Sequence, residues 1–373
     1  MARGNGGDAR RRTTLSDVAA RAGVSPVTVS RALRDPHMVS PALRERVDAA
    51  VRELAYVPNQ LASALASART RTIGVVVPSL TNGVFADYLK ALHDVLVPAG
   101  LHILVSNSRY LVNEEEELIA TLLGQHPEAM IVAGIDQSPR ARLLLEQAGI
   151  PVVQTMELAD DPIDINIGLS QHGAGYAATR YLLDLGYRRI GHIAARLDPR
   201  SRRRMEGYTQ AMDEAGVDYA RSMATTPRAS TVALGGELLA EVLGRANIEA
   251  LFCCNDDLAL GALFECQRRG IRVPDDLAII GFNDLEFCAS AHPALSSVAT
   301  PRYAIAAQAA EIVLEIIRGA GARPDPGRMD VGFAIVERAS TRTRHPGAVA
   351  PAGNSTQPLV QSIAPSQRTA TNR

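Results

Sequence analysis

The sequence predicts an α/β protein in which a small all-α headpiece precedes a large core of two lobes with parallel, doubly wound sheets. Residues 15–33 (LSDVAARAGVSPVTVSRAL) have the pattern of two short helices joined by a tight turn, a unit that places one helix in a groove of DNA. From Thr72 onward, β-branched runs alternate with helical segments over about 270 residues. Residues 1–72 hold 12 arginines and no lysine against six acidic residues, a net charge of +6, while the remainder carries −7. This asymmetry indicates a phosphate-binding surface on the headpiece.

Each expected helix of the headpiece has its own start or stop signal. Gly23 gives the backbone freedom that an abrupt turn between packed helices needs. Ser25 and Pro26 begin the second helix, because serine can cap a free amide and proline at the first position gives up an N–H that had no partner. The same pair at Ser40-Pro41 opens a third helix to about Ala55. The apolar stripes of the three helices are Val18, Ala19 and Ala22; Val29 and Leu33; and Leu43, Val47, Ala50, Val51 and Leu54.

A short segment joins the headpiece to the core. Residues 60–67 (QLASALAS) are helix-forming but weakly apolar, and so short a helix needs a partner to form. We therefore expect a helix-turn-helix domain at 13–58, a hinge helix and linker at 59–71, and the core at 72–345. The low-complexity tails at 1–12 and 346–373 are expected to be disordered.

The core is expected to consist of strands covered by helices on both faces. The predicted strands are 73–77, 101–105, 129–132, 151–153, 190–193, 250–254 and 277–281. The predicted helices lie near 84–97, 114–124, 139–148, 172–185, 205–215, 231–244, 257–269 and 302–318. In such parallel sheets, ligands bind beyond the carboxyl ends of the strands.

Several classes of function lack their signals in this sequence. No run of about 18 apolar residues predicts a membrane span, and no apolar segment follows the basic start, which argues against secretion. The four cysteines lack zinc-type spacing and are expected to be buried, reduced thiols of a cytoplasmic protein. No P-loop occurs, no G-x-G-x-x-G follows a strand, and the histidines are scattered. We therefore expect no catalytic residues, no metal site and no cofactor.

Six motifs follow one another along the chain: VSPVTVSRAL, RERVDAAVRELAYVPN, RTIGVVVPSLTN, CNDDLALGA, RVPDDLAIIGFND and HPALSSV. In this order they resemble the LacI/GalR family of bacterial transcription regulators, over roughly residues 13–345. Within the family, the chain is most similar to the gluconate-utilisation repressor branch. The closer match is carried by residues 78–89 (PSLTNGVFADYL), 195–212 (ARLDPRSRRRMEGYTQAM) and 255–282 (NDDLALGALFECQRRGIRVPDDLAIIGF).

The resemblance implies a cytoplasmic, nucleoid-associated homodimer that binds double-stranded operator DNA. It implies a core similar to periplasmic sugar-binding proteins, with one lobe at about 72–168 and 300–325 and the other at about 169–299 and 326–345. A small molecule bound between the lobes would change their angle and so decide whether the hinge helices form on DNA. The tail has no leucine heptads, so a dimer is expected rather than a tail-driven tetramer.

The family motif implies the residues that contact DNA. Pro26, Val27 and Arg31 match positions that face the major groove, where an arginine can bond O6 and N7 of one guanine together. The alternative for Arg31 is a solvated side chain paired with Asp35. Val27 offers only apolar contact, for example to a thymine methyl, so the operator does not transfer from better-known relatives. Phosphate contacts are expected from Thr14, Ser25, Thr28 and Ser30.

The hinge region supplies two further predicted DNA contacts. Asn59 is expected to contact DNA, and Leu65 falls where the family has a leucine that wedges into the minor groove. The alternative for Leu65 is ordinary apolar packing.

Family matching also implies the residues that contact the effector. They are Ser79, Asn82, Phe85, Met156, Arg204, Asn255 and Asn283. Sugar-binding relatives commonly carry acidic residues where this chain has Met156 and Asn283, so two carboxylates are missing. Arg204, with Arg202 and Arg203 beside it, would add positive charge. The alternative, an exposed basic edge, is favoured for Arg202 and Arg203. A buried carboxylate needs such a partner, so the predicted ligand is gluconate or a related sugar acid.

Other interpretations stay open at this point. The regulator could respond to a neutral or a phosphorylated sugar. From another class, the chain could be a solute-binding protein without a regulatory role, although such a protein has no use for a basic helix module. A nucleic-acid binder without ligand control differs in that no small molecule would change its affinity for DNA.

Overall fold

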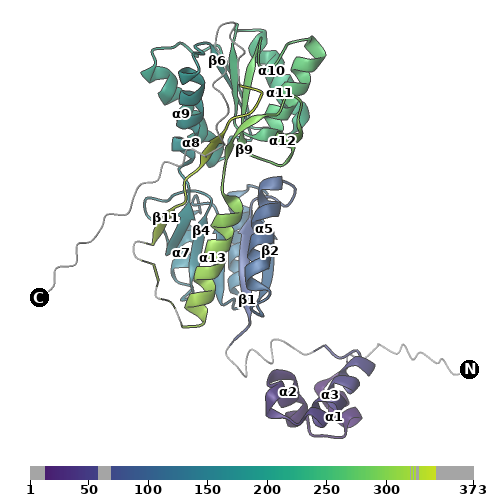
Figure 1. The fold of residues 1–373 in the computed structure, drawn as a ribbon. Helices are drawn as coiled ribbons and strands as arrows, with labels where there is room; N and C mark the ends of the chain where they lie inside the picture. The colour runs from purple at the N-terminus through teal and green to yellow at the C-terminus, as the bar shows by residue number, and fades with distance from the viewer. Residues whose placement is uncertain (1–12, 58–68, 320, 322, 325–326, 342–373) are drawn as a thin grey trace, which may run out of the picture. The chain divides into compact units, whose positions relative to one another are not determined.

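A computed structural model describes residues 13–57, 69–319, 321, 323–324 and 327–341 (Figure 1). The chain divides into two compact units between Arg71 and Thr72. Both predicted tails and most of the predicted hinge, including Asn59 and Leu65, lie outside the described residues.

The first unit is the headpiece, whose described helices are α1 (Leu15–Ala22), α2 (Pro26–Arg34), the 3-10 turn η1 (Pro36–Met38) and α3 (Pro41–Glu53). The start signals act as expected, since the side chains of Ser25 and Ser40 accept from the N–H of Thr28 and Leu43. Gly23 ends α1 with a φ of 65°. The third helix ends at Glu53, slightly before the predicted Ala55. The buried core of the unit is formed by Val18, Ala19, Ala22, Val29, Ala32, Val47 and Ala50.

The second unit contains two lobes, each built on a six-stranded sheet. The first sheet has the order β11-β5-β4-β3-β1-β2 with all neighbours parallel. Its elements are β1 (Thr72–Val77), α5 (Gly83–Leu96), β2 (His102–Asn107), α6 (Val112–Leu123), β3 (Ala129–Ala133), α7 (Pro139–Glu146), β4 (Val152–Thr155), β5 (Ile165–Gly168), α13 (Arg302–Ile317) and β11 (Arg328–Asp330). Helices α5 and α13 pack together over one face, and α6 and α7 cover the other.

The second sheet has the order β12-β10-β9-β8-β6-β7, with only β12 antiparallel. Its elements are α8 (Gln171–Asp184), β6 (Ile190–Ala195), α9 (Pro199–Glu214), β7 (Met223–Thr226), α10 (Val232–Leu243), β8 (Ala250–Cys253), α11 (Asp256–Arg269), β9 (Ala278–Asn283), α12 (Phe287–Ser290), β10 (Ser296–Ala299) and β12 (Ala334–Val336). Helices α8 and α9 pair on one side, and α10 and α11 pair on the other. The predicted α/β class with two parallel-sheet lobes is therefore confirmed.

Three of the sequence expectations need correction. Residues 328–330 pair with β5, so β11 belongs to the first lobe, although the sequence placed 326–345 in the second. Helix α9 begins at Pro199 rather than 205, because Asp198 caps it ahead of the first apolar position. The short strands β5, β7, β10, β11 and β12 were not predicted.

The described residues also bear on two of the excluded classes. All four cysteines are free and buried, as predicted. Within the described part of the chain, every helix is too short or too polar to cross a membrane.

Candidate functional site

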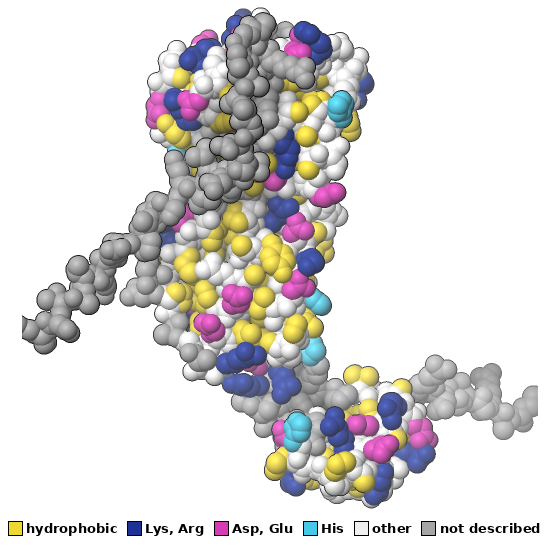
Figure 2. All heavy atoms as spheres, viewed as in Figure 1, with side chains coloured by type: hydrophobic (Ala, Val, Ile, Leu, Met, Phe, Trp, Pro, Cys, Tyr) yellow, Lys and Arg dark blue, Asp and Glu magenta, His cyan; other side chains and the backbone are white. Residues whose placement is uncertain are grey.

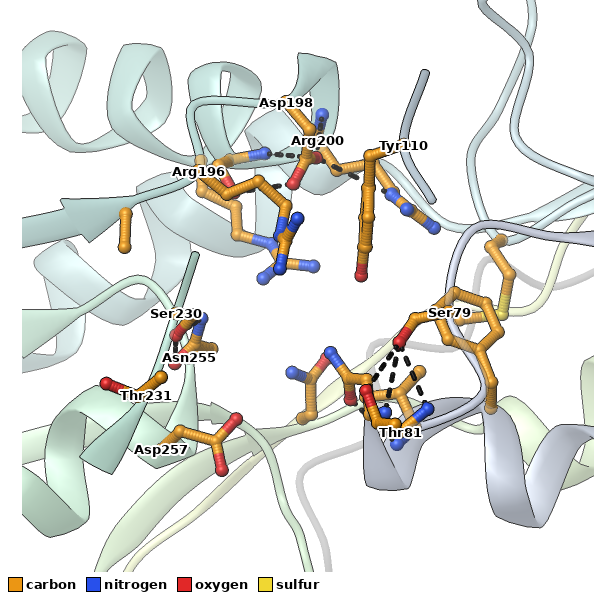
Figure 3. Close-up of a pocket in the computed structure, with 18 residues that line it drawn as sticks. Ser79, Thr81, Tyr110, Arg196, Asp198, Arg200, Ser230, Thr231, Asn255 and Asp257 are labelled. Atoms are coloured by element: carbon orange, nitrogen blue, oxygen red, sulfur yellow. Dashed lines mark hydrogen bonds and ion pairs between the residues drawn. The ribbon is translucent and has the colours of Figure 1, made fainter. Parts of the chain in front are cut away.

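A cavity of about 190 Å³ lies between the two lobes. All seven residues predicted to contact the effector line it (Figure 3). Met156 directly follows β4, and Asn283 is the last residue of β9, so the cavity lies at the carboxyl ends of parallel strands. The sequence missed the other lining residues, which are Thr81, Val84, Tyr110, Ala195, Arg196, Asp198, Arg200, Ser201, Ser230, Thr231 and Asp257.

The first lobe contributes a wall of uncharged side chains that are held by the start of α5. The Ser79 hydroxyl oxygen accepts from the N–H groups of Thr81 and Asn82, at 3.2 and 3.1 Å. Asn82 in turn caps α5 by accepting from the N–H of Val84 at 3.0 Å. These bonds fix the side chains before any ligand is bound, so this wall is preorganised.

Asn255 has a structural task that the sequence did not reveal. Its Oδ1 caps α11 by accepting from the N–H of Leu258 at 3.1 Å, and its Nδ2 donates to the Ser230 hydroxyl at 2.8 Å. Much of the hydrogen-bonding capacity predicted for a ligand is thus used to hold the second-lobe wall in place.

Arg204 lies at the floor of the cavity and is 8% exposed. Its Nε donates to Oε1 of Gln171 and its Nη1 to the carbonyl oxygen of Cys254, both at 2.7 Å. The guanidinium carbon lies 3.7 Å from the ring centroid of Phe282. Burial lowers the pKa of Arg204, but an arginine stays protonated in a protein. The side chain therefore offers a fixed positive charge to the cavity.

The backbone of Arg204 is positioned by the close crossing of α8 and α9. A Cβ on Gly175 of α8 would clash with the carbonyl oxygen of Arg204, and a Cβ on Gly207 would clash with that of His172. Only glycine at both positions lets the two helices approach backbone to backbone. The depth of Arg204 in the lobe follows from this approach.

Arg196, Asp198 and Arg200 lie at the start of α9 or in the loop before it, and Asp257 lies in the first turn of α11. The sequence missed all four of these charges. Asp198 caps α9, accepting from the N–H groups of Arg200 and Ser201 at 3.1 and 3.2 Å. Burial raises the pKa of Asp198, but Arg200, Arg204 and hydrogen bonds from Ser201 outweigh it and lower the pKa. Burial raises the pKa of Asp257. The Asp-Pro start signal at 198–199 could have revealed this helix end.

Arg203 is half-buried and does not form a simple exposed basic edge. It donates to both carboxylate oxygens of Asp136 in the first lobe, at 2.8 and 3.1 Å, and lies 3.7 Å from Glu157. Arg202 is exposed and donates to the carbonyl of Leu197 at 2.8 Å. Among the lining residues of the cavity, three arginines face two aspartates, which leaves a net charge of +1.

The headpiece presents α2 with its predicted reading residues on the surface. Pro26, Val27 and Arg31 are exposed, and Val27 is 69% exposed despite being apolar. Thr28 and Ser30 are half-buried. The side chains of two predicted phosphate contacts are already used as helix caps, Thr14 in a capping box with Asp17, and Ser25 at the start of α2.

Within the described ranges, no cluster of three His, Cys, Asp or Glu residues could hold a metal ion.

Comparisons with known proteins match both units. Residues 14–59 match the model of bacterial regulatory proteins of the lacI family, and residues 179–341 match a periplasmic binding protein-like domain. The HTH-type transcriptional regulator GntR of Pseudomonas aeruginosa is 45% identical over 332 residues, which are 88% of this chain and 96% of that protein.

Solved structures give the same result. A LacI-family transcriptional regulator from Silicibacter pomeroyi is 35% identical in sequence, with a TM-score of 0.84. The matched region spans 89% of this chain and 100% of the chain of that structure. The lac repressor dimer bound to operator and the anti-inducer ONPF is 25% identical, with a TM-score of 0.74 over 89% of this chain and 100% of its own.

Proposed function

Because this chain belongs to the lacI family of bacterial regulatory proteins, we propose that it represses sugar-acid catabolic genes and leaves its operator when gluconate or a related sugar acid binds between its lobes. The chain is a DNA-binding transcription regulator, and the finer part of the proposal is the ligand. The single observation that supports an acid is Arg204, a buried and immobilised guanidinium on the floor of a cavity with a net charge of +1.

The geometry of Arg204 suits a carboxylate better than a neutral sugar. Its hydrogen bonds to Gln171 and Cys254 engage Nε and one hydrogen of Nη1, so the end of the fork that combines Nη1 and Nη2 is compatible with a bidentate pair. The positive charge is held in place before binding, so a carboxylate gains charge-assisted hydrogen bonds without the cost of ordering the arginine. The hydroxyl and amide side chains of the first lobe then suit a polyol chain.

Calorimetry on the full chain with gluconate and with glucose tests this choice directly, because the two share most of their hydroxyl groups. We expect gluconate to bind and glucose to bind at least about tenfold more weakly. Titration of operator DNA with and without gluconate then shows whether the ligand releases the protein. Equal affinity for the two ligands would make the chain a regulator of neutral sugars, and gluconate without effect on operator affinity would remove it as the effector.

On the DNA side, we propose that Arg31 reads a guanine in the major groove. Arg31→Ala should reduce operator affinity by about 1 to 3 kcal/mol and relax the preference at one base pair. Arg44→Ala on the exposed face of α3 is the matched control and should act equally on all sequences or not at all. Binding to a set of operator variants measures the base preference. If Arg31→Ala keeps the full preference at every position, other residues recognise the bases.

Leu65 lies outside the described residues, and its wedge role rests on the family match alone. Leu65→Ala should weaken operator binding greatly while leaving gluconate affinity nearly unchanged. A gel-shift titration that finds equal operator affinity would remove the wedge from the proposal.

We propose a homodimer as the working form, with the first lobe in its interface. Seven of the eleven large hydrophobic side chains that are exposed in the described residues belong to the first lobe, namely Leu80, Val97, Val105, Leu111, Val112, Leu143 and Tyr303. Figure 2 shows hydrophobic side chains across one face of this lobe. Sedimentation of the purified chain measures its mass in solution, and a monomer at micromolar concentration would contradict this proposal.

A regulator of this kind acts on chromosomal DNA, so we propose a cytoplasmic, nucleoid-associated location and no catalytic activity. Recovery of chemically unchanged gluconate after incubation with the protein is the corresponding check.

A further inference from the structure

Two loops of the cleft, one from each lobe, share an uncommon backbone conformation. Arg109 and Tyr110 have φ values of 52° and 62°, and Arg196 and Leu197 have 67° and 53°. Such left-handed residues are strained unless they are glycine, and they persist where the surroundings determine them closely, often at ligand clamps. Of the ten non-glycine residues with positive φ in the described chain, four line the cavity. The strain is therefore concentrated at the cleft.

Hydrogen bonds hold both loops in this conformation. The N–H of Arg109 donates to Oδ1 of Asn107 at 3.1 Å, and its Nε donates to Glu114 at 2.8 Å. In the second lobe, the N–H of Arg196 donates to the carbonyl of Arg228 at 2.8 Å. These bonds fix the direction in which Tyr110 and Arg196 leave the backbone.

The two fixed side chains meet across the cleft. The guanidinium carbon of Arg196 lies 4.0 Å from the ring centroid of Tyr110. That of Arg200 lies 5.9 Å from the same ring and 5.6 Å from the ring of Phe85. Tyr110 and Phe85 belong to the first lobe and both arginines to the second, so cation–π contacts join the lobes at this point.

The stack also lies between two cavities. An outer cavity of about 510 Å³ is lined by Arg202 and Arg203, and it shares Tyr110, Arg196 and Asp198 with the inner one. In Figure 3 the ring of Tyr110 stands beside Arg196, with its hydroxyl directed toward the inner space. Because the two cavities share Tyr110 and Arg196, the stack lies on the direct route from the outer to the inner cavity.

We propose that Tyr110 and Arg196 form a gate that controls the passage of small anions between the outer and the inner cavity. Arg196, Arg202 and Arg203 line the outer cavity against Asp198 and Glu206, so its net charge of +1 favours an anion at the entrance, and opening of the stack admits it. The aromatic ring is the essential part, because it supplies the face on which the guanidinium rests. The gate rests on the proposed function only in taking the inner cavity as the effector site.

The test measures access to the inner cavity without assuming a ligand. Ser230 lines the inner cavity and not the outer one, so Ser230→Cys places a thiol behind the gate. The full chain is labelled with an anionic methanethiosulfonate, and the rate is compared in Tyr110→Leu, Tyr110→Phe and Arg196→Gln backgrounds. The four native cysteines are buried, and the parent chain with Ser230 gives their background. Circular dichroism melts confirm that each variant is folded.

We expect Tyr110→Leu and Arg196→Gln each to speed labelling about tenfold, the factor of one cation–π contact of ordinary strength. Tyr110→Phe keeps the ring, so its labelling rate should stay within about twofold of the rate of Ser230→Cys alone. The double variant should equal Tyr110→Leu, because Tyr110→Leu alone already removes the contact with Arg196. If Tyr110→Leu is labelled at the same rate as Ser230→Cys alone, the gate is overturned. The gate is also overturned if Tyr110→Phe is labelled as fast as Tyr110→Leu. Absence of gluconate binding in calorimetry would contradict the proposed effector and leave these rates unaffected.

Discussion

In the first lobe, all seven side chains that line the cavity are uncharged, whereas the second lobe contributes five charged ones. The two sheets nevertheless have the same strand order and meet at the same cavity. The fold alone therefore does not decide which lobe senses charge. The difference arises from the start of α9 and the loop before it, which bring Arg196, Asp198, Arg200 and Arg204 together.

The comparison shows how a charge is kept inside a protein. The buried charge of Arg204 has fixed partners in Gln171, Cys254 and Phe282. Desolvated ions need such partners, and those of Arg204 come from α8, from the end of β8 and from β9. We infer that the second lobe recognises the acid and the first lobe recognises the polyol chain.

The largest expected effect comes from removing the central charge. Arg204→Ala should weaken gluconate binding by about a hundredfold or more, since it removes charge-assisted hydrogen bonds from a dry site. Operator binding should persist, because Arg204 belongs to the core and not to the headpiece. Arg202→Ala, on the exposed side of the same helix, is the control and should change the affinity far less. Calorimetry that finds the gluconate affinity of Arg204→Ala unchanged would end the assignment of charge recognition to this residue.

A second change tests whether helix packing holds that charge in place. Gly175→Ala should destabilise the chain by about 3 kcal/mol, because the new methyl group meets the carbonyl of Arg204 and overpacking forces the backbone to shift. It should also weaken gluconate binding by moving α9. Gly244→Ala is the matched control, since its Cβ would make only ordinary contacts at 3.5 Å and its φ is −72°.

Denaturant unfolding and calorimetry measure these two effects. If Gly175→Ala proves as stable as Gly244→Ala, the α8–α9 contact is looser than the structure indicates. In the first lobe, α13 contains no glycine, and the residues that it buries are Ile305, three alanines and Val313. The pair of α5 and α13 therefore lacks the glycine-to-carbonyl approach of α8 and α9.

Much of the fold follows from local pattern, and particular segments show where pattern fails. The strand at 73–77 was predicted because its apolar run is strong, whereas β10 (Ser296–Ala299) has two serines whose burial depends on partners far along the chain. The start of α9 was missed because its first two turns carry four arginines, which give no apolar stripe. The tertiary partners that cover this helix are not encoded nearby.

The site shows the same limit. Family matching identified positions next to strand ends, such as Ser79 and Asn283, because strand ends are visible in the sequence. Tyr110 and Arg196 were missed, since their meeting depends on two left-handed turns and on the approach of the lobes. The hydrogen bond from Asn255 to Ser230 was hidden for a related reason, because Ser230 lies 25 residues away.

A third prediction concerns His192 of β6, which lies behind α9 in the charged lobe. Its ring is 4.9 Å from those of Tyr208 and Phe252, and burial lowers its pKa to about 4. In the unfolded chain the His192 ring takes up a proton near pH 6.5, whereas in the folded chain it stays neutral until about pH 4. The folded chain is therefore destabilised as the pH falls from about 6.5 toward 4. Between pH 8 and pH 5 the loss from His192 amounts to about 2 kcal/mol.

Denaturant unfolding of the parent and of His192→Phe at both pH values isolates this effect, because the variant lacks the proton site. Asp256 acts in the opposite direction, since burial raises its pKa to about 6 and its ionisation destabilises the fold as the pH rises from about 4 to 6. The contribution of Asp256 is the same in the parent and in His192→Phe, so it cancels in the difference between their free energies of unfolding. If the difference in free energy of unfolding between the parent and His192→Phe is the same at pH 8 and pH 5, His192 is solvated or protonated in the folded chain.

The smallest expected effect comes from adding a charge to the uncharged lobe. Asn82→Asp keeps a good cap on α5, because aspartate accepts from the N–H of Val84 as asparagine does. It also places a negative charge on the cavity wall, which should weaken gluconate binding about tenfold and leave a neutral polyol unaffected. Asn82→Ser, a neutral residue that also caps helices, is the matched control. If calorimetry finds that Asp and Ser have the same effect, the first lobe is screened from the acid group, and the division of labour between the lobes is then sharper than the lining residues alone indicate.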